Sequence, residues 1–327
     1  MCGEASFHAA LQAGVWGFRL AMGLHDRDHA ADFRAIRAVA AHAALSAGVI
    51  VDLPAARPRT GSMPSCVLTQ GEQVQFVDAQ AYEPDQLGVP LPGLSRYLDW
   101  IRPGHRLIFR DGRQVFRILA AGNVGVTAEC LFASEPLEAS NGCMFPDCPV
   151  VYDPVRDADR DALAAWAEEG LKPEWICASL VSNVGQIKQV REIANTLWPE
   201  DPPRVMAKIE TAIAVDIADT LAVAADGLLL GRGDLGLSVP MERLPMIQDR
   251  LARLARCKGK PLAVATQILE RFAETGTAYR AELSDIALAA RQNMSFLVLC
   301  QETSNSSRPL ACIDLARRII EVESENL

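Results

Sequence analysis

The sequence predicts an α/β protein built as a TIM-type (β/α)8 barrel with a small β domain inserted into it. Three observations lead to this prediction. Short apolar runs alternate with helical patterns in the first sixty residues and again from residue 149 onward, as in repeated βα units. Polar residues stand at the carboxyl ends of most of these runs, where barrels place their functional groups. Between residues 62 and 147 the pattern changes to short β-like segments with turn signals.

The amino-terminal residues 1–61 are predicted to supply the first units of the barrel. Helical spacing of apolar residues around 7–13 precedes a strand at 17–20, and an alanine-rich helix near 33–47 precedes a strand at 48–52. Both strands are short and mostly apolar, as expected for a parallel sheet that is covered on both faces.

Residues 62–147 are predicted to form an inserted, β-rich lid domain. Segments 106–109 and 115–118 flank the turn sequence RDGR at 110–113, and this pattern is typical of a β-hairpin. We therefore divide the chain into an amino-terminal part of the barrel (1–61), the lid (62–147) and the main part of the barrel that carries the site (148–327).

The main part of the barrel contains five further apolar runs, at 175–178, 204–207, 227–230, 261–265 and 295–299. The segments between them are amphipathic; Ile247, Leu251 and Leu254, for example, share one face of a helix. Seven strands are thus visible, one fewer than a complete eight-stranded barrel contains. The two open edges would be covered by residues 1–7, by a neighbouring subunit in a homo-oligomer, or by a part of the gene product outside this chain.

Composition narrows the class of protein. Half of the residues are apolar and the net charge is −9, with lysines and arginines scattered along the chain, which argues against a nucleic-acid partner. Because no apolar run has the length of a membrane span and the first residues lack a signal-peptide pattern, we expect a cytoplasmic protein without a membrane partner. The nine cysteines lack CxxC spacing, which favours free thiols over disulfides or a zinc site.

The strongest chemical signal lies in two motifs, KIE at 208–210 and GRGD at 231–234. Each follows an apolar run, so successive parallel strands would bring Lys208, Glu210 and Asp234 to the same end of the sheet. Two carboxylates there suit a divalent cation, magnesium or manganese, which keeps several waters and binds substrate oxygens. The amides of the glycine-rich turn could bind a carboxylate or phosphate. Taken singly, Lys208 could be a surface lysine and Glu210 a solvated helix start, but their convergence with Asp234 favours a site.

Further polar residues fall at or just beyond predicted strand ends: Arg19, Asp52, Ser179, Thr266 and Glu302. Thr266 is the weakest of these candidates, because a β-branched residue is common at the end of a strand. His25 and His29 could bind a metal through their i, i+4 spacing, but a solvated turn is the favoured interpretation of this polar stretch.

Four segments in order resemble pyruvate kinase: KIE at 208–210, GRGDLG at 231–236, ATQILE at 265–270 and RAELSD at 280–285. The likeness is strongest from about residue 179 to 315. It implies that Glu210 and Asp234 hold a divalent cation and that Lys208 stabilises the phosphoryl group during transfer. It also implies that the amides of Gly233 and Asp234 bind the carboxylate of pyruvate.

The same resemblance implies roles for other residues. Thr266 matches a threonine near the face of the enolate where a proton reaches carbon, and it joins Lys208 and Arg19 as a predicted catalytic residue. Arg19 and Arg59 match arginines that approach the phosphate groups, and Ser179 matches a serine close to the phosphoryl site. Arg232, in the glycine-rich turn, is grouped with the substrate-binding residues.

The chain departs from the family at the potassium site. Members commonly build this site from Asn, Ser, Asp and Thr, and the matching residues here are Ala21, Gly23, Asp52 and Leu53. One aspartate cannot form the cage, so we expect the potassium site to be lost and Asp52 to pair with Arg19 or Arg59.

The nucleotide side departs as well. The sequence SNG at 140–142 stands where the family has a lysine, and CQET at 300–303 replaces Ser-Gly-Glu-Thr. The first strand of the family's barrel and its carboxy-terminal regulatory domain have no counterpart within this chain.

These observations favour a pyruvate kinase-like enzyme that moves a phosphoryl group from phosphoenolpyruvate to ADP with Mg²⁺ or Mn²⁺. Its expected small-molecule partners are phosphoenolpyruvate, pyruvate and ADP or ATP. Two alternatives stay open because of the altered positions. One is a nucleotide-independent, metal-dependent decarboxylase or lyase that acts on pyruvate enolate; the other is a catalytically silent protein that binds phosphoenolpyruvate or pyruvate.

Overall fold

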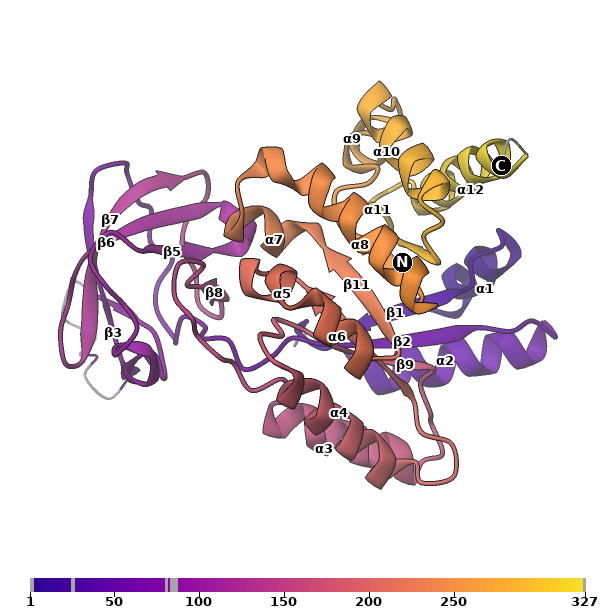
Figure 1. Cartoon of the computed structure of the whole chain (residues 1–327), viewed down its shortest axis with the longest axis horizontal. Coiled ribbons are helices and arrows are strands. Elements are labelled where there is room, and N and C mark those ends of the chain that lie inside the picture. The colour runs from indigo at the N-terminus through magenta and orange to yellow at the C-terminus, as the bar shows by residue number, and fades with distance from the viewer. Residues whose placement is uncertain (1–2, 25–26, 80–81, 83–87, 326–327) are drawn as a thin grey trace.

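Seven parallel strands form the main sheet of the computed structural model, which describes residues 3–24, 27–79, 82 and 88–325 (Figure 1). In spatial order they are β1 (Gly17–Ala21), β2 (Gly48–Leu53), β9 (Trp175–Ala178), β10 (Arg204–Ile209), β11 (Gly227–Gly231), β12 (Leu262–Ala265) and β13 (Phe296–Val298). Each pairs in parallel with the next. All seven predicted strands are confirmed, and the curled sheet is the predicted TIM-type barrel.

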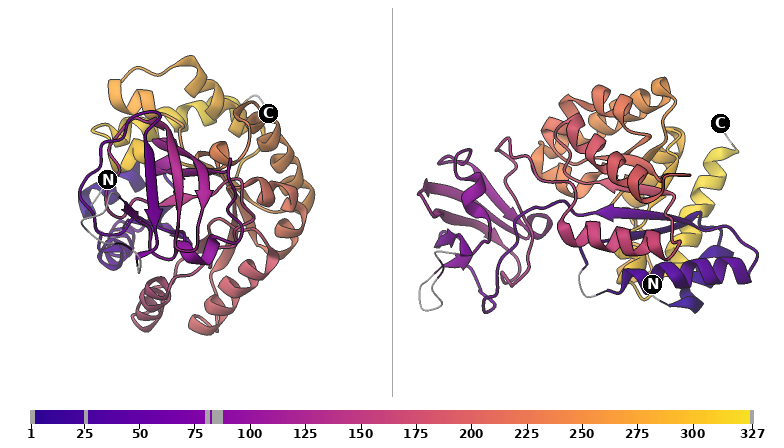
Figure 2. Two further views of the ribbon diagram at one scale, coloured as in Figure 1. Left: turned by 90° about the vertical axis from the view of Figure 1, so that its left-hand side faces the viewer. Right: turned by 90° about the horizontal axis from the view of Figure 1, so that it is seen from below.

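Helices surround the sheet (Figure 2). They are α1 (Glu4–Gln12), α2 (His29–His42), α3 (Asp157–Glu168), α4 (Val184–Leu197), α5 (Ala212–Asp216), α6 (Ala218–Ala224), α7 (Arg232–Ser238), η4 (Met241–Arg243), α8 (Leu244–Lys258), α9 (Glu270–Thr275), α10 (Arg280–Arg291), α11 (Gln301–Ser304) and α12 (Pro309–Ser324). The helix expected near 33–47 begins earlier, because the Asp28 carboxylate caps it by accepting a hydrogen bond from the Ala31 amide. It also ends earlier, at His42, before Ala44 turns the chain with a φ of 53°.

Alternation along the strands decides which side chains reach the barrel interior. In β10, Val205 and Ile209 belong to the large core between strands and helices, whereas Met206 belongs to a smaller cluster inside the barrel. Lys208 shares the face of Met206, because side chains two residues apart point the same way in a strand. The same alternation in β2 sends Asp52 inward. Two charged side chains from different strands therefore enter the same end of the barrel.

The barrel is open between β1 and β13, which are not paired in the described residues. Here the indole ring of Trp16, just before β1, lies against the ring of Phe296 in β13, with 4.9 Å between ring centroids. Outside the sheet, α1 contacts both α2 and α12, and its Phe7 packs on Phe18 of β1 with 5.0 Å between centroids. The described part of the amino-terminal segment, which is one of the three covers considered, thus contributes a helix, α1, beside the gap.

We expect Trp16→Ala to lower the free energy of unfolding by about 2 kcal/mol, since Trp16 is 43% exposed but supplies the aromatic contact between the edge strands. Urea denaturation followed by circular dichroism would measure the loss. Trp100→Ala is the matched control, because this lid tryptophan is similarly exposed, at 45%. An equal or smaller loss in Trp16→Ala than in Trp100→Ala would show that the Trp16–Phe296 contact does not hold the edges together.

The predicted lid contains a second, six-stranded sheet in the order β4-β3-β7-β6-β5-β8 (Figures 1 and 2). Its elements are β3 (Gln73–Val77), β4 (Val89–Pro90), η2 (Leu94–Tyr97), β5 (Arg106–Phe109), η3 (Arg110–Gly112), β6 (Gln114–Ala121), β7 (Gly125–Ala133) and β8 (Cys143–Met144). The predicted hairpin is confirmed as the antiparallel pair β5 and β6. The rings of Phe76, Phe109 and Phe116 form the centre of a separate core, with centroids 4.9 to 5.9 Å apart.

The lid touches the barrel at α7. A Cβ atom on Gly112 would lie only 2.9 Å from the Leu237 side chain, and Leu237 packs against the lid core. Two chain segments connect the lid to the barrel, and they pair with each other through a bridge between Arg59 and Gly142. The lid is therefore placed over the carboxyl ends of the barrel strands.

Two expectations from composition concern the cysteines and the length of apolar helices. The eight cysteines within the described residues are all free. In the same part of the chain, every helix is too short or too polar to span a membrane.

Candidate active site

Lys208 lies at the centre of a buried polar cluster at the carboxyl ends of β2, β9 and β10. Its ammonium group donates to Glu210 Oε1 at 2.9 Å, to Ser179 Oγ at 2.9 Å and to Asp52 Oδ2 at 3.2 Å. Ser179 in turn donates to Asp52 Oδ1 at 3.0 Å. All four residues are buried. The structure therefore brings together Lys208, Glu210, Ser179 and Asp52, which the sequence placed at or just beyond predicted strand ends.

Arg19 joins this cluster from β1. Its Nε donates to Asp52 Oδ2 at 2.6 Å, and its Nη1 lies 3.2 Å from the Cys300 sulfur. Of the two arginines proposed as partners for Asp52, the structure shows Arg19. Arg59 instead donates to the main-chain oxygen of Ser140 at 3.0 Å. Asp52 is thus held by two cations, Arg19 and Lys208.

Burial and the neighbouring charges act in opposite directions on the pKa values of Asp52 and Lys208. Burial alone would raise the pKa of Asp52, but Lys208 and Arg19 outweigh it and lower that pKa. Burial would lower the pKa of Lys208, yet Asp52 and Glu210 raise it. The pKa of Glu210 is raised, first by burial and then, against the pull of Lys208, by the nearby charges of Asp234 and Asp52. The Glu210 carboxylate is thus repelled by the carboxylates of Asp234 and Asp52, and a bound cation would relieve this repulsion.

The turn after β11 places Asp234 near Glu210. A Cβ atom on Gly231 would lie 2.7 Å from the Glu210 side chain, so only glycine fits here. The helix α7 begins at Arg232, with Asp234 in its first turn, where the helix dipole favours an acidic residue. The main-chain amide of Leu180 donates to Glu210 Oε2 at 2.9 Å and fixes the carboxylate.

Thr266 and Gln267 adopt an unusual backbone conformation, with φ angles of 72° and 55°. Positive φ is rare for a β-branched residue and costs on the order of 1 to 3 kcal/mol, so it marks a position that the surrounding structure enforces. The Thr266 hydroxyl accepts a hydrogen bond from the Gly233 amide at 3.0 Å. Arg232 donates to the Thr266 carbonyl at 2.8 Å and pairs with Asp285 at 2.6 Å. Arg232 therefore supports the Thr266 turn, while its predicted contact with substrate stays a prediction.

Arg57 is a site residue that the sequence analysis missed. Its Nη1 lies 3.3 Å from Asp234 Oδ1. Arg57 belongs to the irregular segment that leads from β2 into the lid, so no strand end or helix face singled it out. The one available signal was its closeness in sequence to Arg59.

Two other candidate residues, Glu302 and His29, make hydrogen bonds outside the charged cluster. Glu302 is 1% exposed and accepts hydrogen bonds from the amides of Ile268 and Cys300, at 2.8 and 2.6 Å. It fastens the segment after β12 to the segment after β13. His29 Nε2 lies 3.0 Å from the Leu24 carbonyl oxygen, and His25, its proposed partner for a metal, lies outside the described residues.

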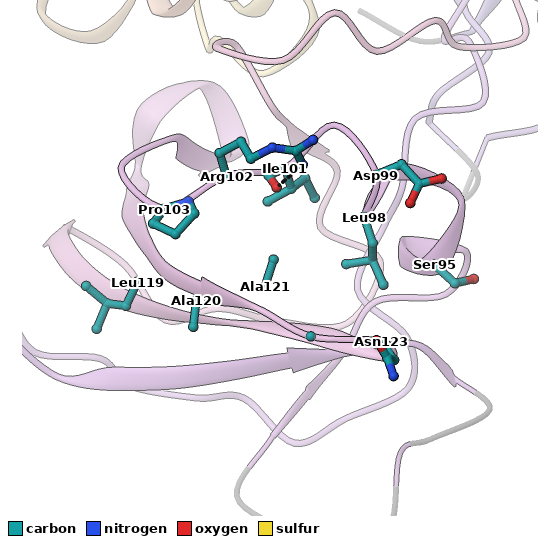
Figure 3. A pocket seen from close by; sticks show the side chains of 11 residues that line it. Ser95, Leu98, Asp99, Ile101, Arg102, Pro103, Leu119, Ala120, Ala121 and Asn123 are labelled. Atoms are coloured by element: carbon teal, nitrogen blue, oxygen red, sulfur yellow. Dashed lines mark hydrogen bonds between the residues drawn. The ribbon is translucent and has the colours of Figure 1, made fainter.

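A hollow of about 610 Å³ lies in the lid, where Leu98 and Arg102 face Leu119 and Asn123 (Figure 3). No residue of the charged cluster lines it. Its lining is largely exposed and neutral, apart from Asp99 and Arg102. The charged cluster is therefore the better candidate for chemistry.

The predicted divalent cation can be tested against the donors present. Within the described residues, no group of three or more His, Cys, Asp and Glu side chains has the geometry of a metal site. Asp234 is nevertheless close enough to Glu210 for its charge to contribute to the raised pKa of Glu210. Two carboxylates suit Mg²⁺ or Mn²⁺, which commonly keep several waters and bind substrate oxygens in place of further protein ligands. The residues fit the cation.

The fold and this cluster define a barrel protein with an inserted lid and a charged site at the carboxyl ends of its strands. The family model for the pyruvate kinase barrel domain matches residues 5–313. The chain belongs to the pyruvate kinase family.

Pyruvate kinase from Agrobacterium vitis is 30% identical over 312 residues, which cover 94% of this chain and 64% of that protein. Pyruvate kinase from Methylorubrum extorquens is 29% identical over 322 residues, which cover 97% of this chain and 64% of that protein. The chain thus spans 64% of the length of these relatives.

Solved structures share the fold. A pyruvate kinase from Cryptosporidium parvum superposes with a TM-score of 0.88 at 22% identity, covering 99% of this chain and 67% of that one. Pyruvate kinase from Pyrobaculum aerophilum gives a TM-score of 0.86 at 24% identity, and the match covers 98% of this chain and 70% of that one.

Proposed function

We propose that this protein transfers a phosphoryl group from phosphoenolpyruvate to ADP with the help of Mg²⁺ or Mn²⁺. The observation that carries the proposal is the convergence of Lys208, Glu210 and Asp234 at the carboxyl ends of adjacent barrel strands. Membership of the pyruvate kinase family supports the same chemistry.

The side chains can divide the work of phosphoryl transfer, which requires mainly positioning and neutralisation of charge. Glu210 and Asp234 would hold the cation, which supplies positive charge next to the enolate and phosphoryl oxygens. Lys208 carries a fixed positive charge beside them because its pKa is raised. Arg19, at 25% side-chain exposure, can reach a phosphate oxygen while Asp52 orients it.

Thr266 is the proposed residue at the carbon end of the enolate. Its hydroxyl is held between the Gly233 amide and the Ala265 carbonyl, at 3.0 and 2.6 Å. In this position it can orient a water that delivers a proton to carbon. The pyruvate carboxylate is proposed to bind at the amide of Asp234 and, after a shift of Thr266, at the amide of Gly233.

We expect the activity to be independent of potassium, because Ala21 and Gly23 offer no side-chain oxygen and Asp52 already binds Arg19 at 2.6 Å. Replacing KCl by tetramethylammonium chloride at constant ionic strength should change kcat by less than about twofold, the range expected from screening alone. A loss of turnover without potassium, restored by adding it back, would contradict this expectation.

The altered nucleotide side favours a second candidate, a metal-dependent enzyme that stabilises pyruvate enolate without any nucleotide. At the lid's return to the barrel, Asn141 provides no cation, and its side-chain oxygen accepts from the Glu138 amide at 3.0 Å. Oxaloacetate decarboxylation, or exchange of the pyruvate methyl protons in ²H₂O that ADP does not affect, would support this candidate. Calorimetric binding of phosphoenolpyruvate without any turnover would instead identify a silent binding protein.

An assay of pyruvate formation tests the leading proposal. Purified protein with phosphoenolpyruvate and Mg²⁺ should release pyruvate only when ADP is present. Release that is equally fast without ADP would exclude phosphoryl transfer to the nucleotide as the reaction.

A further inference from the structure

Leu180, two residues after β9, adopts an unusual backbone conformation, with a φ of 52°. Residues other than glycine rarely take this left-handed conformation, because their Cβ atom crowds the main chain. The amide of the same residue donates to Glu210 Oε2 at 2.9 Å. An unfavourable turn therefore provides the hydrogen bond that orients one of the two carboxylates proposed to hold the cation.

Three consecutive side chains after β9 enter three different environments. Ser179 Oγ contacts Asp52 and Lys208 of the charged cluster, at 3.0 and 2.9 Å. Leu180 is buried in the lid core, whereas Val181 is buried in the core between the barrel strands and helices. In an extended strand, Ser179 and Val181 would share one face. The chain therefore has to turn at Leu180 to separate them.

The Leu180 side chain meets the lid's return segment (143–152), in which the chain passes from the lid back to the barrel. Leu180, Phe145 and Tyr152 line one cavity of about 30 Å³ at this junction. Because a cavity of this size holds about one water, the side chains around it are closely packed. The free energy gained by burying a leucine is larger than the cost of the left-handed conformation. Packing at the junction can thus enforce the turn.

Gln186, in the first turn of α4, fastens the main chain after Leu180 to the same return segment. Its Nε2 donates to the Tyr152 carbonyl at 2.6 Å, and its Oε1 accepts from the Ser182 amide at 2.7 Å. Gln186 is itself buried, with 4% exposure. The turn that contains Leu180 is therefore tied to the lid's return segment by apolar packing and by hydrogen bonds.

We propose that Leu180 is a positioning residue for the cation site: the packing of its side chain against the lid's return segment enforces the left-handed turn, and this turn aims its amide at the Glu210 carboxylate. The inference rests on the proposed function and deepens it, because Glu210 is a proposed ligand of the divalent cation. Leu180 acts through Glu210 alone. Hydrogen bonds that orient a metal ligand commonly change the affinity for the metal by about tenfold or more.

A comparison of Leu180→Ala with Leu180→Gly tests the proposal, because both remove the packing and only glycine accepts the left-handed turn without cost. Hydrogen exchange at the residue 180 amide is measured on the whole chain without metal. Electron paramagnetic resonance of free Mn²⁺ gives the affinity for Mn²⁺ alone.

In Leu180→Ala, the protection of this amide, relative to an unstructured peptide, should fall by about tenfold, the factor that corresponds to the cost of the left-handed conformation. Mn²⁺ should bind to this variant about tenfold more weakly than to the wild type. In Leu180→Gly, both quantities should stay within about threefold of the wild type, because glycine can keep the turn and its hydrogen bond.

Leu163→Ala is the matched control, since Leu163 in α3 is 1% exposed and the substitution removes the same side chain from the core between the barrel strands and helices. It should lower stability without changing either quantity. The proposal would be overturned if both quantities stayed unchanged in Leu180→Ala, or if Leu180→Gly lost as much as Leu180→Ala, since the role would then be packing alone. The predicted pattern of protection in a protein that binds no Mn²⁺ would refute the cation of the proposed function and leave the positioning of Glu210 intact.

Discussion

Lys208→Met should reduce phosphoryl transfer by about a thousandfold or more, because it removes the fixed positive charge that faces the transferred group. The Lys208 ammonium group is the only one that contacts Asp52, Ser179 and Glu210 together in the described structure. Methionine has a similar length and fills the space without charge. We expect kcat to fall far more than the affinity for phosphoenolpyruvate, and steady-state kinetics separate these two quantities.

The variant should remain folded. Asp52 keeps Arg19 as a partner, and Glu210 keeps the hydrogen bond that its carboxylate accepts from the Leu180 amide. Lys172→Met serves as the control, because Lys172 pairs with Asp201 on the surface and should be dispensable. A Lys208→Met protein with wild-type turnover would remove Lys208 from the mechanism.

Asp52→Asn should lower the free energy of unfolding at neutral pH by about 3 kcal/mol, because it removes a buried carboxylate that pairs with both Lys208 and Arg19. Asp201→Asn, at a surface carboxylate with 78% side-chain exposure, should cost less than about 1 kcal/mol. Denaturant titrations at pH 7 compare the two variants. Equal losses would show that the buried cluster does not depend on the charge of Asp52.

Asp52→Asn should also change how the free energy of unfolding depends on pH. The pKa of Asp52 is lower in the folded protein than its ordinary value of 3.8, so the folded state binds this proton less readily than the unfolded state. The stability that Asp52 contributes is therefore complete above that value and is lost as the pH falls below it. The difference between wild type and Asp52→Asn should shrink from pH 6 to about pH 3. A difference that stays constant over this range would contradict the cause assigned to the shift.

The barrel could be predicted from sequence because its strands are apolar on both faces and its helices are amphipathic. Lys208, Glu210 and Asp234 could be predicted for a related reason: each follows a strand, and parallel strands end at one rim. Neither prediction requires knowledge of which strands are neighbours in the sheet.

The remaining features depend on neighbours in space. The sequence left Arg19 and Arg59 open as partners of Asp52 and did not indicate Lys208. The strand order β1-β2-β9-β10 places Arg19 and Lys208 beside Asp52, and sequence patterns do not give this order. Arg57 lies in a loop without periodicity, so its contact with Asp234, 177 positions away, appears only in three dimensions. The positive φ angles of Thr266 and Gln267 run against local preference, and the contacts of Arg232 and Gly233 with Thr266 accompany them.

Phosphorus NMR of the purified protein with Mg²⁺, phosphoenolpyruvate and ADP tests the central claim most directly. The phosphoenolpyruvate signal should decline while the three signals of ATP appear, and neither change should occur with Lys208→Met. A phosphoenolpyruvate signal that persists unchanged with folded wild-type protein would contradict phosphoryl transfer at this site.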